Sequence, residues 1–308
     1  MKQVLITLVL LFSCKIEGAN PDTHHTASSD MTAVRTIAPQ SENDASHAYF
    51  LQLLDLALSQ SSDKYGDYQI LLSPDTSTQG RWFRMLKDNR YLDVIWAGSN
   101  LTREQDFTAI PVDLLGGILG VRTLIIRKQD RQVFLAIDSI EALSKLVACH
   151  GKHWPDTEIL RNAGLPVMTV SSYEANFTML ERERCDYFPR GIHEAYSEIE
   201  QYHVLNGNRL AIFDELLIVY PFNMWFFVDQ NNSVLAERLQ FGLTQARNNG
   251  SLLQLMKQNP ITAHLFPIEK WQDKKVITIE NQQASLIDNP NAWWLLETFP
   301  FYSSGLNK

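Results

Sequence analysis

The amino-acid sequence predicts an α/β protein whose sheets are mostly parallel and flanked by helices. Two observations support this prediction. From residue 33 onward, short apolar runs of strand length alternate with amphipathic helical stripes, and such alternation calls for parallel sheets. The apolar run Leu92–Ala97 also stops at the small residues Gly98, Ser99 and Asn100, and hydrogen-bonding groups directly after a buried strand are typical of the sheet edge where α/β proteins bind ligands.

Composition restricts the class of partner. The chain has 308 residues, enough for two domains with cores of their own, and 45% apolar with 20% charged residues are ordinary values for a soluble globular protein. The formal net charge is −8 without a basic patch, which argues against nucleic acid. No cofactor is expected, and no run after the amino terminus is long and apolar enough for a membrane helix.

The amino terminus is typical of an exported protein. Lys2 precedes the apolar run Val4–Phe12, which is too short to span a bilayer but has the length of a signal-peptide core, so residues 1–19 are predicted to be a signal peptide. Cys14 follows this run in a sequence that resembles a bacterial lipoprotein cleavage site. The alternative is simple secretion with cleavage near residue 18 or 19. Residues 20–32 are polar without periodicity and are expected to form a flexible leader.

The first half of the chain has the pattern β-α-β-α-β. Residues 33–38 are predicted to be a strand that Pro39 ends. Apolar residues at i, i+3, i+4, i+7 and i+8 from Phe50 predict an amphipathic helix, with Asp44 or Ser46 as its cap. A strand at 68–73, a helix at 81–87 and the strand at 92–97 follow, and a further buried strand is expected at 120–126.

The second half repeats the alternation. Residues 140–146 are predicted to be helical, 146–149 extended and 155–163 helical, because Pro155 favours a first turn and Gly164 a helix end. A strand at 167–170, a helix at 173–181 and a strand at 186–188 come next. Pro221 then separates apolar runs at 215–220 and 224–228, and an apolar stripe predicts a long helix that begins at residue 232 or 233 and stops at Gly250.

A series of residues around the central strand points to a family. Asp93 lies in the strand, residues 98–100 are small, Thr102 begins a charged turn, and Phe107 follows. This series resembles the polar-amino-acid family of bacterial periplasmic solute-binding proteins, which have the type II periplasmic binding fold. The resemblance extends over about residues 33–258, and the chain would be a divergent member.

The resemblance implies two lobes with a ligand cleft between them, each lobe a mostly parallel sheet flanked by helices. Lobe I would be discontinuous, with residues 33–120 and 225–260, and lobe II would be inserted as residues 121–224. Hinge closure would trap the ligand. Residues 261–308 lie beyond the family pattern, and their aromatic residues suggest a carboxy-terminal extension packed on the body.

Four loops and one crossing between the lobes are expected to line the cleft. The loops are residues 40–43, residues 99–103, residues 151–157 and residues 186–190, the last of which leave a strand tip. Residues 151–157 open a helix, and the free N–H groups of such an amino terminus suit an anion. Phe222 could complete an aromatic wall at the second crossing. The ligand-binding candidates are Ser41, Glu42, Ser99, Asn100, Thr102, Arg103, Trp154, Asp156, Thr157, Tyr187, Arg190 and Tyr220.

Two departures from the family pattern bear on the ligand. Family members that bind amino acids hold the α-carboxylate with an Arg three residues after the Thr matched by Thr102, and Gln105 stands there. They also present an acidic residue to the α-amino group just past the strand tip matched by Asp186, where Arg190 places a cation. A buried ammonium against Arg190 would be costly, so the expected ligand is a small polar or anionic molecule rather than an ordinary amino acid.

Several candidates also have simpler structural explanations. Arg190 could pair with Glu194 or Asp186, Trp154 could belong to the core, and residues 99–100 could satisfy only a turn.

The sequence Cys149-His150-x-x-His153 could suggest a metal site or a nucleophile with a base. A metal would need a third ligand from His193 or Asp156, and nothing obvious lowers the pKa of Cys149. Neither a metal site nor a catalytic residue is therefore predicted.

Cys149 and Cys185 are the cysteines that follow the leader. Export would allow one disulfide between them. The two positions are expected at opposite edges of one sheet, so both are predicted to be free, buried thiols.

Together these observations predict a monomeric, non-catalytic solute-binding protein, periplasmic or otherwise exported, with Cys14 as a candidate lipid anchor. It would serve a membrane permease of an ABC transporter or provide input to a sensor. Two alternatives remain open. A cleft enzyme of dehydratase type could use Glu42, Asp156 or Glu194 as base, and a binding module that has lost its ligand could contact a partner protein.

Overall fold

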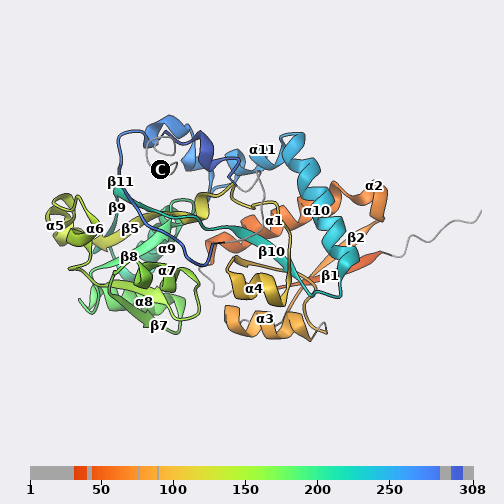
Figure 1. Ribbon diagram of the computed structural model, residues 1–308, viewed down its shortest axis with the longest axis horizontal. Helices are drawn as coiled ribbons and strands as arrows, with labels where there is room; N and C mark the ends of the chain where they lie inside the picture. Colours follow the sequence, from red (N-terminus) through yellow and green to blue (C-terminus); the bar gives the residue numbers. More distant parts are fainter. Residues whose placement is uncertain (1–30, 40–43, 75–76, 89, 285–292, 301–308) are drawn as a thin grey trace, which may run out of the picture.

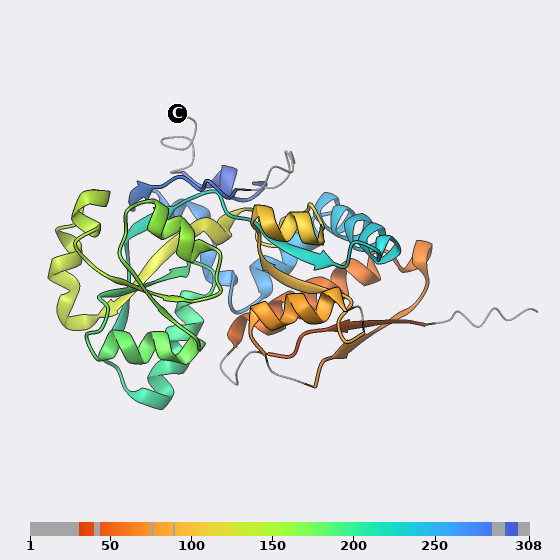
Figure 2. The same cartoon turned by 60° about the horizontal axis from the view of Figure 1, so that its bottom comes forward.

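The computed structural model describes residues 31–39, 44–74, 77–88, 90–284 and 293–300. The elements of these ranges form two lobes side by side, each a sheet with helices packed against it (Figure 1, Figure 2). The α/β fold with two lobes that the sequence predicts is therefore present. The predicted signal peptide, Cys14 and most of the leader lie outside the described residues.

Lobe I holds two small sheets. Strands β1 (Thr32–Thr36) and β2 (Tyr68–Leu72) are parallel, and β10 (Met224–Val228) lies antiparallel between β3 (Ile95–Gly98) and β4 (Thr108–Ala109). Backbone N–H groups of residues 93 and 94 donate to the carbonyl of residue 35 at 2.9 and 3.2 Å, so β1 lies next to the start of β3.

The helices of lobe I are α1 (Ala45–Ser59), α2 (Ser62–Tyr65), α3 (Gln79–Lys87), α4 (Leu101–Asp106), α10 (Ser233–Asn248) and α11 (Ser251–Gln258). Asp44 caps α1 by accepting from the His47 N–H, as the sequence suggests. Helices α1 and α10 pack at Gly242, where an added Cβ would lie 1.8 Å from the Ala57 carbonyl oxygen. Only glycine allows this approach.

Lobe II is built on a six-stranded sheet. Its order is β11 (Lys275–Thr278), β9 (Leu210–Val219), β5 (Val121–Arg127), β8 (Tyr187–Gly191), β6 (Ala148–Gly151) and β7 (Val167–Val170). Strand β5 is antiparallel to both neighbours, and the remaining pairs are parallel. Helices α5 (Arg131–Leu135), α6 (Ile140–Leu143), α7 (Asp156–Asn162), α8 (Tyr173–Glu181) and α9 (Ala195–Asn206) flank it.

The chain passes between the lobes at two adjacent crossings, residues 113–121 and 219–224. The Tyr220 N–H donates to the Gly120 carbonyl at 3.1 Å, and a Cβ at Gly120 would lie 1.8 Å from the Tyr220 oxygen. The buried Asp113 carboxylate joins both crossings, since it accepts from the N–H groups of residues 115, 117 and 224 and from the Asn223 amide. Burial raises the pKa of Asp113 to about 6 despite these hydrogen bonds.

The described parts of the carboxy-terminal extension contact both lobes. Residues 261–284 run from α11 across to the lobe II sheet, which β11 joins beside β9 (Figure 1). Trp271 is buried and donates its indole N–H to the Leu265 carbonyl at 3.0 Å. Trp294 donates to the Asp113 carbonyl, and the N–H groups of residues 295 and 296 donate to Gly116. The extension therefore packs along the crossings.

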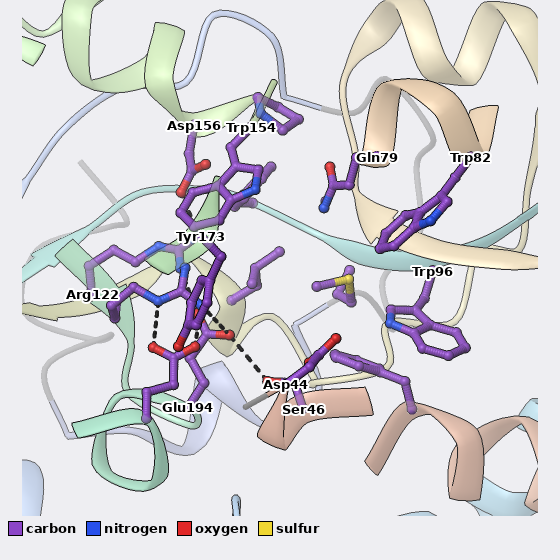
Figure 3. A pocket seen from close by; sticks show the side chains of 18 residues that line it. Asp44, Ser46, Gln79, Trp82, Trp96, Arg122, Trp154, Asp156, Tyr173 and Glu194 are labelled. Atoms are coloured by element: carbon purple, nitrogen blue, oxygen red, sulfur yellow. Dashed lines mark hydrogen bonds and ion pairs between the residues drawn. The ribbon is translucent and has the colours of Figure 1, made fainter. Parts of the chain in front are cut away.

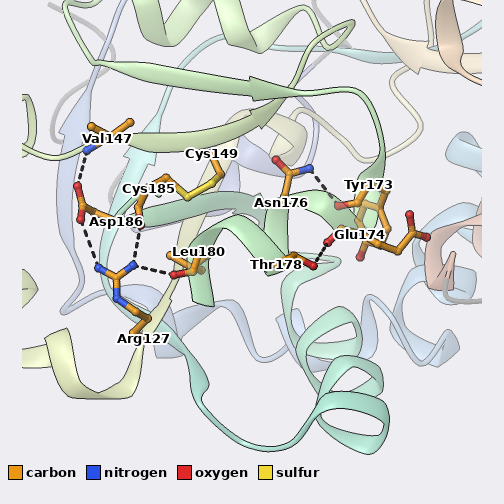
Figure 4. Close-up of a disulfide and its surroundings, with 10 residues drawn as sticks. All are labelled: Arg127, Val147, Cys149, Tyr173, Glu174, Asn176, Thr178, Leu180, Cys185 and Asp186. Carbon is orange, nitrogen blue, oxygen red and sulfur yellow. Dashed lines mark hydrogen bonds and ion pairs between the residues drawn. A yellow bond between two sulfur atoms is a disulfide. The ribbon is translucent and has the colours of Figure 1, made fainter. Parts of the chain in front are cut away.

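Cys149 and Cys185 form a disulfide, with their Cα atoms 5.6 Å apart, and the prediction of two free thiols is wrong (Figure 4). The reason lies in the strand order. Strand β8 pairs directly with β6, so Cys185, two residues before β8, lies beside Cys149 within β6 rather than at the far edge. Arg127 fixes the neighbouring turn by donating to the carbonyls of Leu180 and Cys185.

Candidate functional site

A cavity of about 110 Å³ lies between the lobes, with walls from both (Figure 3). Lobe I and the crossings contribute Asp44, Ser46, Phe50, Gln79, Trp82, Trp96, Gly98, Leu119, Phe222 and Met224. Lobe II contributes Arg122, Trp154, Pro155, Asp156, Tyr173, Arg190, Glu194 and Glu198.

The lobe I side of the cavity is mainly aromatic. Helix α3 turns the apolar face that carries Trp82 inward, while α1 and β3 supply Phe50 and Trp96, whose rings stack with centroids 5.6 Å apart. Gly98 lines the cavity next to Phe222, and a Cβ at residue 98 would lie 2.3 Å from the Phe222 ring, so a larger residue would disturb this part of the wall. Within the described part of the chain, nothing accepts a hydrogen bond from the Trp82 indole N–H.

The lobe II side is charged, and Arg122 is one centre of it. Its guanidinium donates to Asp156 at 2.6 Å and to the Tyr220 hydroxyl at 2.9 Å, and it lies 3.5 Å from Glu194. Burial opposes ionisation of Asp156, but His150 and Arg122 outweigh it and hold the pKa of that carboxyl well below its usual range. Asp156 is therefore a carboxylate at neutral pH.

Arg190 is the second centre. It donates twice to Glu198, at 2.6 and 2.7 Å, and reaches Glu194 at 3.0 Å. Its guanidinium also lies 4.8 Å from the ring centroid of Trp154. Burial opposes ionisation of Glu194, but Arg190 outweighs it and lowers the pKa, whereas burial raises the pKa of Glu198 despite Arg190.

Two contacts reach directly across the cleft. The Ser46 hydroxyl, at the start of α1, donates a hydrogen bond to the Glu194 carboxylate at 3.4 Å. Arg103 donates to the carbonyl of Gly98 and the side chain of Gln79 in lobe I, and at 3.3 Å to the His153 carbonyl of lobe II. A second cavity, of about 320 Å³, opens beside the first and shares Gln79, Trp154 and Tyr173 with it.

Of the candidates taken from the sequence, the structure places Trp154, Asp156 and Arg190 on the cavity wall. Tyr220 lies behind that wall, where its hydroxyl donates to Asp156 at 3.1 Å. Ser41 and Glu42 lie outside the described residues.

The remaining candidates line neither of the two cavities. Asn100 caps α4, Ser99 donates to Glu104, and Thr102 is exposed. Thr157 donates to the Gly151 carbonyl, and the Tyr187 ring is fully buried in the lobe II core.

Arg122 and the aromatic residues of lobe I are absent from the sequence-based candidates. One signal for Arg122 was available: it is a charged residue within the buried-strand pattern 120–126, and a buried charge needs partners. For Trp82 and Trp96 there was no such signal, because a helix stripe and a buried strand would place both in an ordinary core.

The Cys149-His150-x-x-His153 segment does not form a metal site. Cys149 is in the disulfide, and among the described residues no three or more His, Cys, Asp or Glu side chains are grouped to hold a metal ion. The disulfide also removes Cys149 as a nucleophile. No helix in the described ranges has the length and apolarity needed to cross a membrane.

Comparison with known proteins places the fold. No family model and no curated protein sequence matches the chain. Among solved structures, the GluR0 ligand-binding core of Nostoc punctiforme in complex with L-glutamate aligns with a TM-score of 0.52 at 16% identity, over 75% of this chain and 99% of that one. An ancestral arginine-binding protein bound to arginine aligns with a TM-score of 0.54 at 15% identity, over 74% and 98%.

A histidine kinase sensor domain with similarity to periplasmic binding proteins gives a TM-score of 0.54 at 15% identity, over 75% of this chain and 96% of that one. The chain therefore has the two-lobed type II periplasmic binding fold. At these identities it is a divergent representative, as the sequence resemblance implies.

Proposed function

We propose that this protein is a solute-binding protein that traps a small polar molecule between its lobes. The observation that carries the proposal is the cavity whose walls come from both lobes, since closure around such a site couples ligand binding to the hinge. Its 110 Å³ is below the roughly 300–1,000 Å³ of pockets that hold drug-sized molecules, which favours a ligand of few atoms.

The carboxylate partners of Arg190 argue against one part of the sequence-based expectation, namely that Arg190 binds an anionic group of the ligand. The sequence suggested Arg190 as a partner for an anionic group of the ligand, but Glu198 already accepts two hydrogen bonds from Arg190, and Glu194 forms an ion pair with it. An anion would have to displace one of these carboxylates.

The proposal includes export. The predicted signal peptide supports it, and so does the disulfide, because disulfides persist in oxidising compartments. Lipidation at Cys14 or simple secretion would both leave the cleft facing solvent. As a partner we propose a transporter permease or a sensor; the likeness to a histidine kinase sensor domain supports the second.

The dehydratase-like alternative receives less support from the site. Asp156 and Glu194 are paired with arginines, and the pKa of each is below its usual range, which makes them weak bases. Glu42 lies outside the described residues.

Native mass spectrometry of the purified protein tests the proposal, combined with thermal unfolding against amino acids, carboxylates, amines and neutral polyols. A retained small molecule, or a saturable rise in Tm with one compound class, is expected. The Gly98→Ala variant should lose this binding, because its Cβ drives the Phe222 ring toward the cavity. Gly80→Ala is the matched control, since its nearest contact would be His153 at 4.0 Å. Absence of any bound mass and of any Tm shift would contradict the proposal.

A further inference from the structure

The carboxy-terminal extension connects the lobes a third time, in addition to the two crossings. Figure 1 shows it reaching from α11 of lobe I across to β11 of lobe II. The buried Thr262 is attached to lobe I, because its hydroxyl donates to the Met256 carbonyl of α11 at 2.6 Å. His264 is attached to lobe II, since its ring Nε2 donates to the Ile192 carbonyl at 2.7 Å. The His264 ring also packs on that of Tyr196 in α9, with centroids 4.6 Å apart.

This third connection is short. One residue separates Thr262 from His264, and two residues of fully extended chain span at most roughly 7 Å. Further along, β11 pairs with β9 over residues 275–278, and Lys274 forms an ion pair with Asp214 of β9 at 2.8 Å. A movement that separates α11 from the turn after β8 must therefore break one of the two hydrogen bonds.

The turn after β8 belongs to the wall of the cleft. Ile192 lies between Arg190 and Glu194, which line the cavity. Its N–H donates to the Val121 carbonyl at the end of the first crossing, at 3.0 Å. No described residue of the extension lines either of the two cavities of the cleft. The extension therefore contacts the backbone that positions these side chains and stays out of the cavity itself.

The extension also packs on the glycines of the first crossing. Gly116 and Gly117 have positive φ angles of 63° and 89°, and glycine has more accessible backbone conformations than any other residue. The N–H groups of residues 295 and 296 donate to the buried Gly116 carbonyl at 3.2 and 2.9 Å, and a Cβ on Gly116 would lie 2.4 Å from that of Leu295. The part of the crossing that could rotate most easily is therefore held in place.

The second crossing is held in the same way. The Ile279 N–H donates to the Val219 carbonyl at 2.9 Å, and the side-chain amide of Asn281 donates to the Pro221 carbonyl at 2.7 Å. The first and last described parts of the extension meet where Trp271 packs near Phe299. Both crossings are thus hydrogen-bonded to the same packed segment.

We propose that the carboxy-terminal extension restrains the hinge and limits how far the lobes open. Ser46 and Glu194 are in contact across the cleft, so the movement available to this arrangement is opening. Opening would have to break the bonds of Thr262 and His264 or those at Gly116, and a buried polar group that loses its partner is destabilising. The restraint acts with or without a ligand and is a property of the chain beyond solute binding.

Pulsed electron paramagnetic resonance tests the restraint by measuring the distance between spin labels on the two lobes. Arg84→Cys in α3 and Asn162→Cys in α7 place the labels at exposed positions. Cys14→Ser leaves them as the only free thiols, because Cys149 and Cys185 are paired. Without a ligand, the labelled protein with an otherwise unchanged extension should give one narrow distance distribution.

Breaking the attachments of the extension should release the lobes. His264→Ala/Trp294→Phe removes the donors to the Ile192 and Asp113 carbonyls, and it should roughly double the width of the distribution, toward longer distances. Urea unfolding shows whether each variant is folded. Should this double variant fail to fold, His264→Ala/Asn281→Ala keeps Trp294, breaks the bond to the second crossing instead, and should give the same widening.

His203→Ala is the matched control. His203 also donates from its ring Nε2 to a backbone carbonyl, that of Leu210 at 2.9 Å, but both residues belong to lobe II. This variant should leave the distribution unchanged.

Three results would overturn the restraint: a broad distribution in the protein with the unchanged extension, no widening in the variants of His264, or an equal widening in His203→Ala. Solute binding would stand in each case, because native mass spectrometry and thermal unfolding test it separately.

Discussion

The side-chain amide of Asn223 donates a hydrogen bond to the Asp113 carboxylate at 2.9 Å, and this contact joins the two crossings between the lobes. The same carboxylate accepts three backbone N–H groups. A buried acid thus holds the segments about which the lobes would move.

The buried Asp113 should make stability depend on pH. Its pKa is raised from 3.8 to about 6, so the folded protein keeps a proton that the unfolded chain releases between these values. The contribution of Asp113 to the free energy of unfolding is therefore most favourable below pH 4 and is lost as pH rises through 6. Urea unfolding at each pH measures the free energy of unfolding of the wild type and of Asp113→Asn. The stability advantage of the wild type over this variant should fall by about 3 kcal/mol from pH 4 to pH 7. Parallel pH profiles would refute this.

The disulfide should stabilise the folded chain. Cys149 and Cys185 are separated by 36 residues, and closing a loop of this length in the unfolded state is worth about 4 kcal/mol in the chain-entropy model. Cys149→Ala/Cys185→Ala should lose stability of this order in denaturant unfolding. A reductant should lower the stability of the wild type and leave that of the double variant unchanged. The prediction would be contradicted if the wild type, unfolded and refolded in the presence of reductant, kept its full stability.

Breaking the Arg190–Glu198 pair should be costly. Glu198→Gln leaves a buried guanidinium with one carboxylate partner fewer, and such losses cost roughly 3–5 kcal/mol. Glu158→Gln is the control, because Glu158 pairs with Arg161 on the exposed face of α7 and should change the free energy of unfolding by about 1 kcal/mol or less. The double variant Arg190→Met/Glu198→Leu should recover much of the loss. Equal effects of the two Glu→Gln changes would argue against a buried pair.

The carboxy-terminal extension should contribute to the stability of the body. Trp271 is 1% exposed and its ring centroid lies 6.4 Å from that of Phe299, so Trp271→Ala should cost roughly 3–5 kcal/mol. Thermal and urea unfolding measure this loss. Val204→Ala, at a side chain that is 81% exposed, should change little. If Trp271→Ala unfolds like the wild type, the extension does not stabilise the body.

Most of the fold could be predicted because its elements have strong local patterns. The helix at Tyr173–Glu181 and the strand at Val167–Val170 are found at their expected bounds. The residues after β3 were expected to form a turn and instead form α4, with Asn100 as its cap. Local sequence patterns do not show the order of strands within a sheet. The wrong prediction for Cys149 and Cys185 follows from this, because it depended on where their strands lie.

The site was less predictable than the fold because lining a cavity depends on which way a side chain points. Tyr187 and Arg190 lie in one strand, yet the first packs in the core and the second faces the cleft. Arg190 contacts Glu194, the partner that the sequence suggested. Its hydrogen bonds go to Glu198, which lies eight residues further along in the first turn of α9 and which no local sequence pattern indicated. The aromatic side of the cavity could be recognised only once both lobes were placed.

Two contacts across the cleft, Arg103 with the His153 carbonyl and Ser46 with Glu194, are formed between protein groups and involve no ligand. Both contacts can therefore form when the lobes are closed, whether or not a ligand is bound. Each such contact raises the fraction of molecules already closed before a ligand arrives, and the apparent affinity then approaches the intrinsic affinity of the closed site. Removing the Arg103 side chain would accordingly weaken every ligand by the same factor, whatever its charge, and so tune the sensitivity of the protein without altering its selectivity.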